Sequence, residues 1–304
     1  MIEYSNVWRK ENREVHKFLR AIGFSDITKK DLEMILDEVI TRPEIMKITK
    51  DSEGNEFAEL SGSFAANAGI TVRGTYQEDD SFHMDYYYPY VFGTSITTNE
   101  QIDVEKHAEK ESYAGVCDEV NLGVTLIFYI QNVADYLAET NRHLSKIHYG
   151  AMLAGLSTEG KILCPVVERK KNDVPAIQKN DRHNQLIAQA REGDEDAIES
   201  LTLEDMDTYA LLSQRVMKED IFSIVKSTFM PFGIESDQYT VLGEIIDCVT
   251  MENRLTHEKL YGMKLLCNNI QFDVCINEKD LLGEPAIGRR FRGNVWMQGN
   301  LCLE

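Results

Sequence analysis

The chain has 304 residues, of which 43% are hydrophobic and 27% are charged, and its formal net charge at pH 7 is -19. This composition is typical of a globular protein and argues against extensive disorder. The negative charge disfavours broad binding to nucleic acid or to anionic membranes, because both require a basic surface. The length favours two domains over one.

The location of the protein is predicted from what the chain lacks. No apolar run approaches the roughly 20 residues that span a bilayer, and the first residues do not have the basic-then-apolar order of a signal peptide. The six cysteines are scattered, without a C-x-x-C pair. We therefore expect a cytoplasmic protein whose thiols are free and mostly buried.

The first forty residues predict two helices. The first carries an apolar stripe that ends at Gly23. In the second, Thr28 stands three residues before Asp31, which is close to a capping box. The apolar positions that follow have helical spacing up to Arg42-Pro43; they are Leu32, Ile35, Leu36, Val39 and Ile40.

Strand-like segments follow the helices. The candidates are 56–61, 69–76, 81–91, 120–130, 149–156 and 161–167. Residues 100–119 are highly charged and are expected to form a loop or a short helix. Ser157-Thr-Glu-Gly160 is expected to join the last two candidates as a hairpin.

The polar, proline-containing segment 169–184 is the best candidate for a linker. Two helices are expected after it, over 186–201 and from 202 to 216. Four strand candidates complete the chain, at 220–230, 238–249, 259–276 with a bend near Asn268-Asn269, and 288–302.

These elements predict an α+β fold, in which the N-terminal helices pack on a mixed or antiparallel sheet. A helical segment and a small C-terminal β-barrel, of which the oligonucleotide/oligosaccharide-binding fold is one form, are expected to follow. The predicted domains are 1–168 and 185–304.

The last strand candidate carries the clearest functional pattern. Phe291, Val295, Met297 and Leu301 alternate with polar residues, so one strand face is expected to be buried. Arg289, Arg290, Arg292 and Trp296 are then candidate binding residues, because guanidinium groups bind carboxylates or phosphates and an indole stacks on flat surfaces. The competing interpretation is that these arginines pair with the protein's own surplus of acids.

A second candidate surface is the aromatic strand 82–90. Tyr86 and Tyr88 share one strand face there, either as ordinary packing residues or as a pocket wall whose phenols orient a ligand.

Catalytic motifs are weak or incomplete. Gly155-Leu-Ser-Thr-Glu-Gly160-Lys161 resembles a phosphate-binding loop, but Ile162 stands where Ser or Thr would hold magnesium. The histidines are dispersed, so neither a metal nor a cofactor is predicted. The favoured hypothesis is a non-catalytic binding or regulatory protein with an unidentified protein or small-molecule ligand. The alternative is an enzyme that brings His83 or His107 together with Asp118 or Glu119.

Three long blocks of the chain look familiar together. They are His16-Lys-Phe-Leu-Arg-Ala-Ile-Gly-Phe24, Gly123-Val-Thr-Leu-Ile-Phe-Tyr-Ile-Gln-Asn132, and the run from Gly283 to Gly299. With them the chain resembles, over nearly its whole length, a family of uncharacterised bacterial proteins classed only as a domain of unknown function. The resemblance implies a bacterial cytoplasmic protein and carries no activity, cofactor or site residues.

Overall fold

The computed structural model describes residues 15–106, 110–141, 148–166, 186, 189–190, 194, 196–202, 225–234 and 236–303. The chain is built mostly of strands. The helical elements whose bounds the structure describes are η2 (Lys17–Ile22), α1 (Lys29–Thr41), α2 (Val133–Asn141) and η3 (Glu278–Asp280). The strands before the predicted linker are β1 (Ile45–Lys50), β2 (Glu56–Ala65), β3 (Ala68–Tyr76), β4 (Phe82–Val91), β5 (Thr98–Lys106), β6 (Tyr113–Glu119), β7 (Val124–Ile130) and β8 (His148–Leu163). Those after it are β9 (Thr228–Pro231), β10 (Gln238–Glu252), β11 (Lys259–Cys267), β12 (Ile270–Asn277), β13 (Leu281–Leu282) and β14 (Arg290–Leu301).

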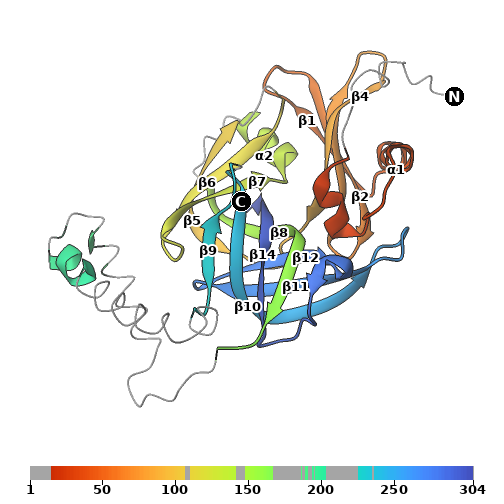
Figure 1. Cartoon of the computed structure of the whole chain (residues 1–304). Coiled ribbons are helices and arrows are strands. Elements are labelled where there is room, and N and C mark those ends of the chain that lie inside the picture. The colour runs from red at the N-terminus through yellow and green to blue at the C-terminus, as the bar shows by residue number, and fades with distance from the viewer. Residues whose placement is uncertain are drawn as a thin grey trace.

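Strands β1 to β4 form a four-stranded antiparallel sheet in chain order. Helix α1 contacts β2 and β3, and the side chain of Val39 lies directly over Gly62. In Figure 1, α1 covers the outer side of this sheet, while α2 and the larger sheet lie on its other side.

The remaining strands form a ten-stranded sheet organised around β8 and β14, which pair with each other from Arg290↔Leu163 to Leu301↔Ala151. Two closed rings of paired strands share this central pair. One ring runs through β10, β11 and β12, and the other through β5, β6 and β7.

The predicted fold class is wrong. The chain does not form helices on one sheet followed by a separate small barrel, because two large sheets dominate it. Strand β8, from the predicted N-terminal domain, is a member of both rings, so the described C-terminal strands are not closed among themselves. Sequence periodicity shows where strands lie but does not show which distant strand each one pairs with.

Two apolar cores follow from this arrangement. The first lies inside the ten-stranded sheet and includes Phe128, Leu126 and Phe291. The second lies between the two sheets and the N-terminal helices, and it joins Phe18 and Leu36 to Trp296. The predicted buried side of the last strand is confirmed, because Phe291, Val295, Met297 and Leu301 are at most 3% exposed.

Local predictions had mixed outcomes. Helix α1 is confirmed, including its cap, because the Thr28 hydroxyl accepts a hydrogen bond from the Asp31 amide. The hairpin expected at 157–160 is wrong, since β8 runs straight through it with a register shift opposite Asn294 and Val295. The expected loop or short helix at 100–119 is also wrong, because β5 and β6 form there.

The bend expected near Asn268-Asn269 is a two-residue turn between β11 and β12, with φ values of 47° and 69°. Positive φ at both central residues matches the turn twist that hairpins prefer, and Asn tolerates it better than most residues.

Several predictions concern residues outside those described. The linker 169–184, the helix 202–216 beyond residue 202 and strand 220–230 before residue 225 lie there, so the domain division stays a prediction. Residues 196–202 are helical, as expected. All six cysteines are free, and Cys117, Cys267 and Cys275 are buried. In the part of the chain that the structure describes, no helix is both long and apolar enough to cross a membrane.

Candidate functional site

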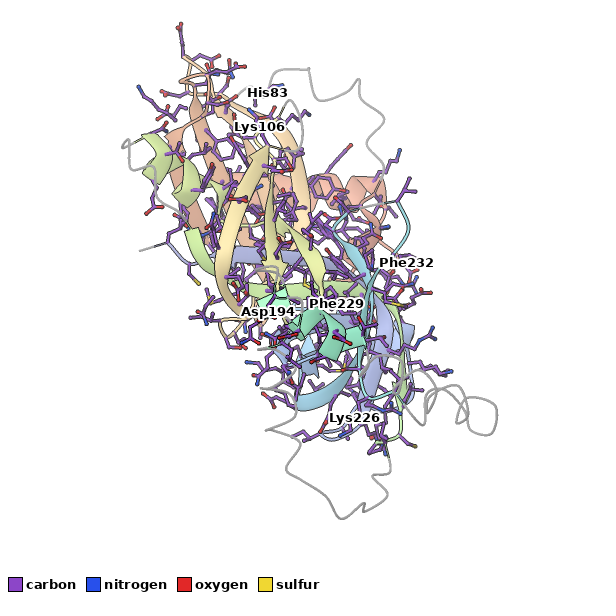
Figure 2. The ribbon with its side chains drawn as sticks, turned by 90° about the vertical axis from the view of Figure 1, so that its left-hand side faces the viewer. His83, Lys106, Asp194, Lys226, Phe229 and Phe232 are labelled. Atoms are coloured by element: carbon purple, nitrogen blue, oxygen red, sulfur yellow. The ribbon has the colours of Figure 1, made fainter. Side chains whose placement is uncertain are left out.

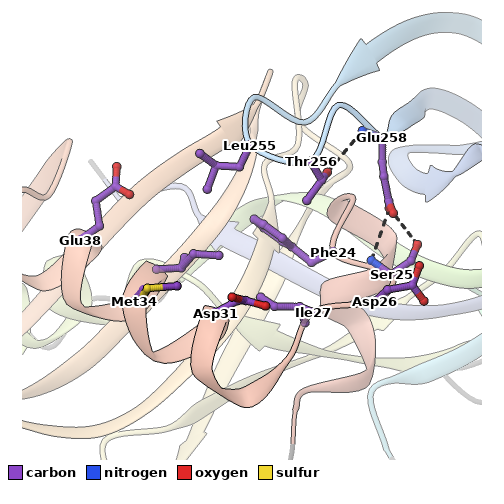
Figure 3. A pocket seen from close by; sticks show the side chains of 11 residues that line it. Phe24, Ser25, Asp26, Ile27, Asp31, Met34, Glu38, Leu255, Thr256 and Glu258 are labelled. Carbon is purple, nitrogen blue, oxygen red and sulfur yellow. Dashed lines mark hydrogen bonds between the residues drawn. The ribbon is translucent and has the colours of Figure 1, made fainter.

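A groove of about 360 Å³ lies between α1 and the turn that joins β10 to β11. Figure 3 shows the α1 side chains on one side, Leu255 and Thr256 on the other, and Phe24 between them. Its lining residues are Phe24, Ser25, Asp26, Ile27, Asp31, Met34, Ile35, Glu38, Leu255, Thr256 and Glu258.

The two walls are held together at Gly23, where η2 ends. Gly23 has φ of 93°, and a side chain there would lie 2.6 Å from the Cβ of Asn253. Asn253 is fully buried; its amide nitrogen donates to the Ile22 carbonyl, and its amide oxygen accepts from the backbone of Leu255 and Thr256. Glycine is therefore required here both for the left-handed turn and for the close approach of the second wall.

Glu258 closes one end of the groove. Its carboxylate accepts hydrogen bonds from the Ser25 hydroxyl at 2.8 Å, the Asn277 amide at 2.6 Å and the Lys279 ammonium at 2.6 Å. Burial opposes ionisation of Glu258, but these hydrogen bonds outweigh it and lower its pKa. The Glu258 carboxylate is therefore ionised and fully hydrogen-bonded, and it positions Ser25 and the turn between β10 and β11.

The lining carries charge of one sign only. Among the residues that the structure describes, it contains four carboxylates, those of Asp26, Asp31, Glu38 and Glu258, and no Lys, Arg or His. Glu258 is already paired with Lys279 at 2.6 Å. Of the other three acids, two have a cation at the margin: Lys279 lies 3.7 Å from Asp26, and Arg254 lies 3.7 Å from Glu38. Both of those contacts are long and solvent-exposed, so they neutralise the rim only weakly.

The groove also has exposed apolar surface. Phe24 and Ile35 belong to the core at its base and are at most 9% exposed. Met34 and Leu255 are 55% and 44% exposed, one on each wall. Apolar surface bordered by a few charged groups is the usual composition of a ligand site.

A second polar centre lies between the two sheets, around Arg73 on β3. The side chain is fully buried, and its guanidinium donates six hydrogen bonds. The acceptors are the Glu59 carboxylate, the hydroxyls of Tyr86, Tyr88 and Tyr129, and the carbonyls of Ile130 and Gln131. Burial opposes the charge, but these tyrosines and Glu59 raise the pKa of Arg73. The centre is closed to ligands and joins the two sheets.

The tyrosines predicted as a pocket wall are partners of Arg73. Tyr86 also donates to the Glu111 carbonyl at 2.7 Å, and Tyr88 donates to the Gln131 carbonyl at 3.2 Å. The structure thus brings Tyr86 and Tyr88 together, but in an interior network.

Two of the four C-terminal candidate residues are buried and two are exposed. Trp296 is 7% exposed, stacks on Phe18 at 5.2 Å and donates its indole N–H to Asp237 at 2.7 Å. Arg290 is 5% exposed and donates to the carbonyls of Cys164 and Val225. Arg289 and Arg292 are exposed.

The residues of the alternative enzyme hypothesis are not seen together. His83 is exposed and lies 3.8 Å from Asp85, and Figure 2 shows it at the opposite end of the molecule from Lys226. Glu119 is buried and binds the backbone and amide of Asn121. His107 lies outside the described residues. Among the residues that are described, no group of three or more His, Cys, Asp and Glu side chains is placed to hold a metal.

A protein-family model for a domain of unknown function matches residues 19–299. The chain belongs to this family. Its description is "Domain of unknown function, E. rectale Gene description (DUF3881)", and the family resemblance expected from the sequence blocks is confirmed. The match to DUF3881 includes both walls of the groove. No curated protein and no solved structure matches the chain.

Proposed function

We propose that this DUF3881 protein is a non-catalytic binding protein of the cytoplasm, and that its groove receives a segment of a partner protein. The segment combines a large apolar side chain with a neighbouring Lys or Arg. One observation carries the proposal: Met34 and Leu255 expose apolar surface inside a rim whose described lining has four carboxylates, one of them paired with Lys279, and no basic residue.

The size of the groove supports this choice of ligand. A volume of about 360 Å³ is near the lower end for small-molecule sites, and it suits one or two inserted side chains. A cation that approaches Asp31 or Glu38 would gain electrostatic attraction in a chain whose net charge is already -19.

The chemistry of the groove favours binding over catalysis. Ser25 donates to Glu258, but the lowered pKa of that carboxylate makes it a weak general base. Activation of a nucleophilic hydroxyl requires a base that can accept its proton. The Ser25–Glu258 pair does not provide such a base. The enzyme alternative built on His83 or His107 stays a prediction.

The proposal is tested with a short fluorescein-labelled peptide in which Leu alternates with Arg, by fluorescence anisotropy on the full chain. Met34→Gln is expected to weaken binding by about tenfold, because it removes an apolar anchor. Glu38→Gln is expected to weaken it by about threefold and to reduce its salt dependence.

Matched controls separate the groove from the general acidity of the protein. Met46→Gln removes a side chain of the same kind that is 49% exposed on β1, and Glu53→Gln removes an exposed carboxylate in the β1–β2 turn. Both controls should bind the peptide like the wild type. Equal losses in Met34→Gln and Met46→Gln would refute the groove as the binding site.

The predicted roles of Arg289 and Arg292 on the C-terminal strand remain proposals as well. Trp296 is buried against Phe18 and donates to Asp237, so it does not itself face a ligand.

A further inference from the structure

The loop from β13 into β14 presents two of the most exposed large apolar side chains among the described residues. Leu282 is 71% exposed and Ile287 is 69% exposed. Both side chains belong to one short loop, so a partner that covers the loop would remove both from water.

Backbone hydrogen bonds hold this loop, residues 281–289, in one shape. Leu281 and Leu282 pair with Gly160 and Lys161 of β8. The Gly288 amide donates to the Ile245 carbonyl at 2.8 Å, and the Ile245 amide donates to the Arg289 carbonyl at 2.8 Å. A loop that is already ordered loses little conformational entropy when it binds.

The loop carries one exposed cation, Arg289, and one exposed carboxylate, Glu284, and two further exposed cations lie beside it on β8 and β14. Arg289 is exposed, and its guanidinium donates to the Glu284 carbonyl at 2.6 Å, which orients the group and leaves its charge uncompensated by that contact. Arg292 and Lys161, both exposed, are register partners on β14 and β8. The loop therefore combines exposed apolar side chains with nearby cations, and the groove combines exposed apolar side chains with carboxylates.

We propose that the groove of one copy of this protein receives loop 281–289 of a second copy, with Ile287 on the apolar floor and Arg289 against the acidic rim. This inference rests on the proposed function of the groove. Within one copy the loop does not line the groove, and its pairing with β8 and β10 holds it in its present place.

The proposed contact is heterologous, because each copy contributes a different surface to each of its two neighbours. Such contacts extend into rings or chains. One loop in one groove buries little surface, so we expect weak association in the micromolar range or above.

The test is sedimentation velocity on the full chain, over concentrations from about 5 to about 500 µM, chosen for an interface of this size. The mean mass of the wild type should rise with concentration. Met34→Gln, which alters the groove, and Ile287→Gln, which alters the loop, should each weaken the association by about tenfold. Ile48→Gln, at an isoleucine that is 45% exposed on β1, is the matched control and should behave like the wild type.

An equimolar mixture of the two variants gives the sharpest result. The Ile287→Gln copy keeps its groove and the Met34→Gln copy keeps its loop, so the mixture should form dimers and nothing larger. A wild type that stays monomeric throughout, or a mass increase that neither variant reduces, would overturn the inference.

The peptide measurement distinguishes the two proposals. If the Leu/Arg peptide binds the groove while the wild type stays monomeric, the loop is not the occupant and the groove proposal stands. If self-association depends on Ile287 but neither it nor peptide binding depends on Met34, both the groove proposal and the loop–groove contact are wrong.

Discussion

Arg73 is a charged side chain held entirely inside the protein. A guanidinium has five N–H groups, and those of Arg73 are directed at six acceptors from β2, β4 and β7 and from the residues after β7. Its register partner on β2 is Glu59, which is 6% exposed. A buried ion pair of this kind adds little net stability, but removal of one partner leaves an uncompensated charge in the interior.

We therefore predict that Arg73→Met lowers the free energy of unfolding by roughly 3–5 kcal/mol, measured by urea denaturation. The double variant Arg73→Met/Glu59→Leu should lose less than the single variant, because it no longer buries an unpaired carboxylate. If the double variant is the less stable of the two, the network stabilises the fold by some means other than charge compensation.

Helix α1 forms one wall of the groove, so its stability and ligand binding are linked. The Thr28 hydroxyl accepts from the Asp31 amide at 3.2 Å and donates to the Asp31 carboxylate at 2.6 Å. Four backbone amides at a helix start have no partner within the helix, and this cap satisfies one of them.

Thr28→Ala is expected to reduce the free energy of unfolding by about 1 kcal/mol, whereas Thr28→Ser keeps the hydroxyl and should have little effect. Peptide binding should weaken in the alanine variant, because Asp31 and Met34 lie in the first turns of α1. Thermal denaturation with anisotropy on the same samples checks both effects, and an unaffected alanine variant would show that the cap is not needed.

The elements that could be predicted from the sequence are those whose buried residues recur at the full spacing of a helix or a strand. In α1 the apolar stripe from Leu32 to Val39 faces the sheet, so its period is clear. Strand β5 has only Thr98 and Ile102 buried, so its sequence lacks the alternation of apolar and polar residues that predicts a strand. Strand β8 continues through 157–160 because it pairs there with β14, a strand that is distant in the sequence. The Ser157 hydroxyl also donates to the Asn294 carbonyl of β14.

At the scale of the whole molecule, neither the cover over β14 nor the groove could be predicted, because each combines segments that are far apart in the sequence. The outward face of β14 is covered at Trp296 by η2, which lies near the other end of the chain. The groove has Met34 on one wall and Leu255 on the other, and neither residue belongs to a recognisable sequence motif. The one available signal was that Met34 lies outside the apolar stripe of α1 and must therefore face solvent or a ligand.

The central β8–β14 pair also determines how the predicted domains relate. Their register extends from residue 151 to residue 163 on β8, so strands before and after the predicted linker form one sheet. Among the described strands, neither those of 1–168 nor those of 185–304 close a ring by themselves, because β8 and β14 belong to both rings. Each half alone would expose strand edges and the apolar core between them.

We predict that cutting the chain within 169–184, at an inserted protease site, leaves the two fragments bound together. They should co-elute in size-exclusion chromatography and separate only in denaturant, because the shared pair buries Phe291, Val295 and Met297. The same site inserted into the β1–β2 turn at Glu53-Gly54 is a control for cleavage within a single sheet. Fragments of the 169–184 cut that separate in native buffer, and that each keep a cooperative unfolding transition, would instead establish two independent domains.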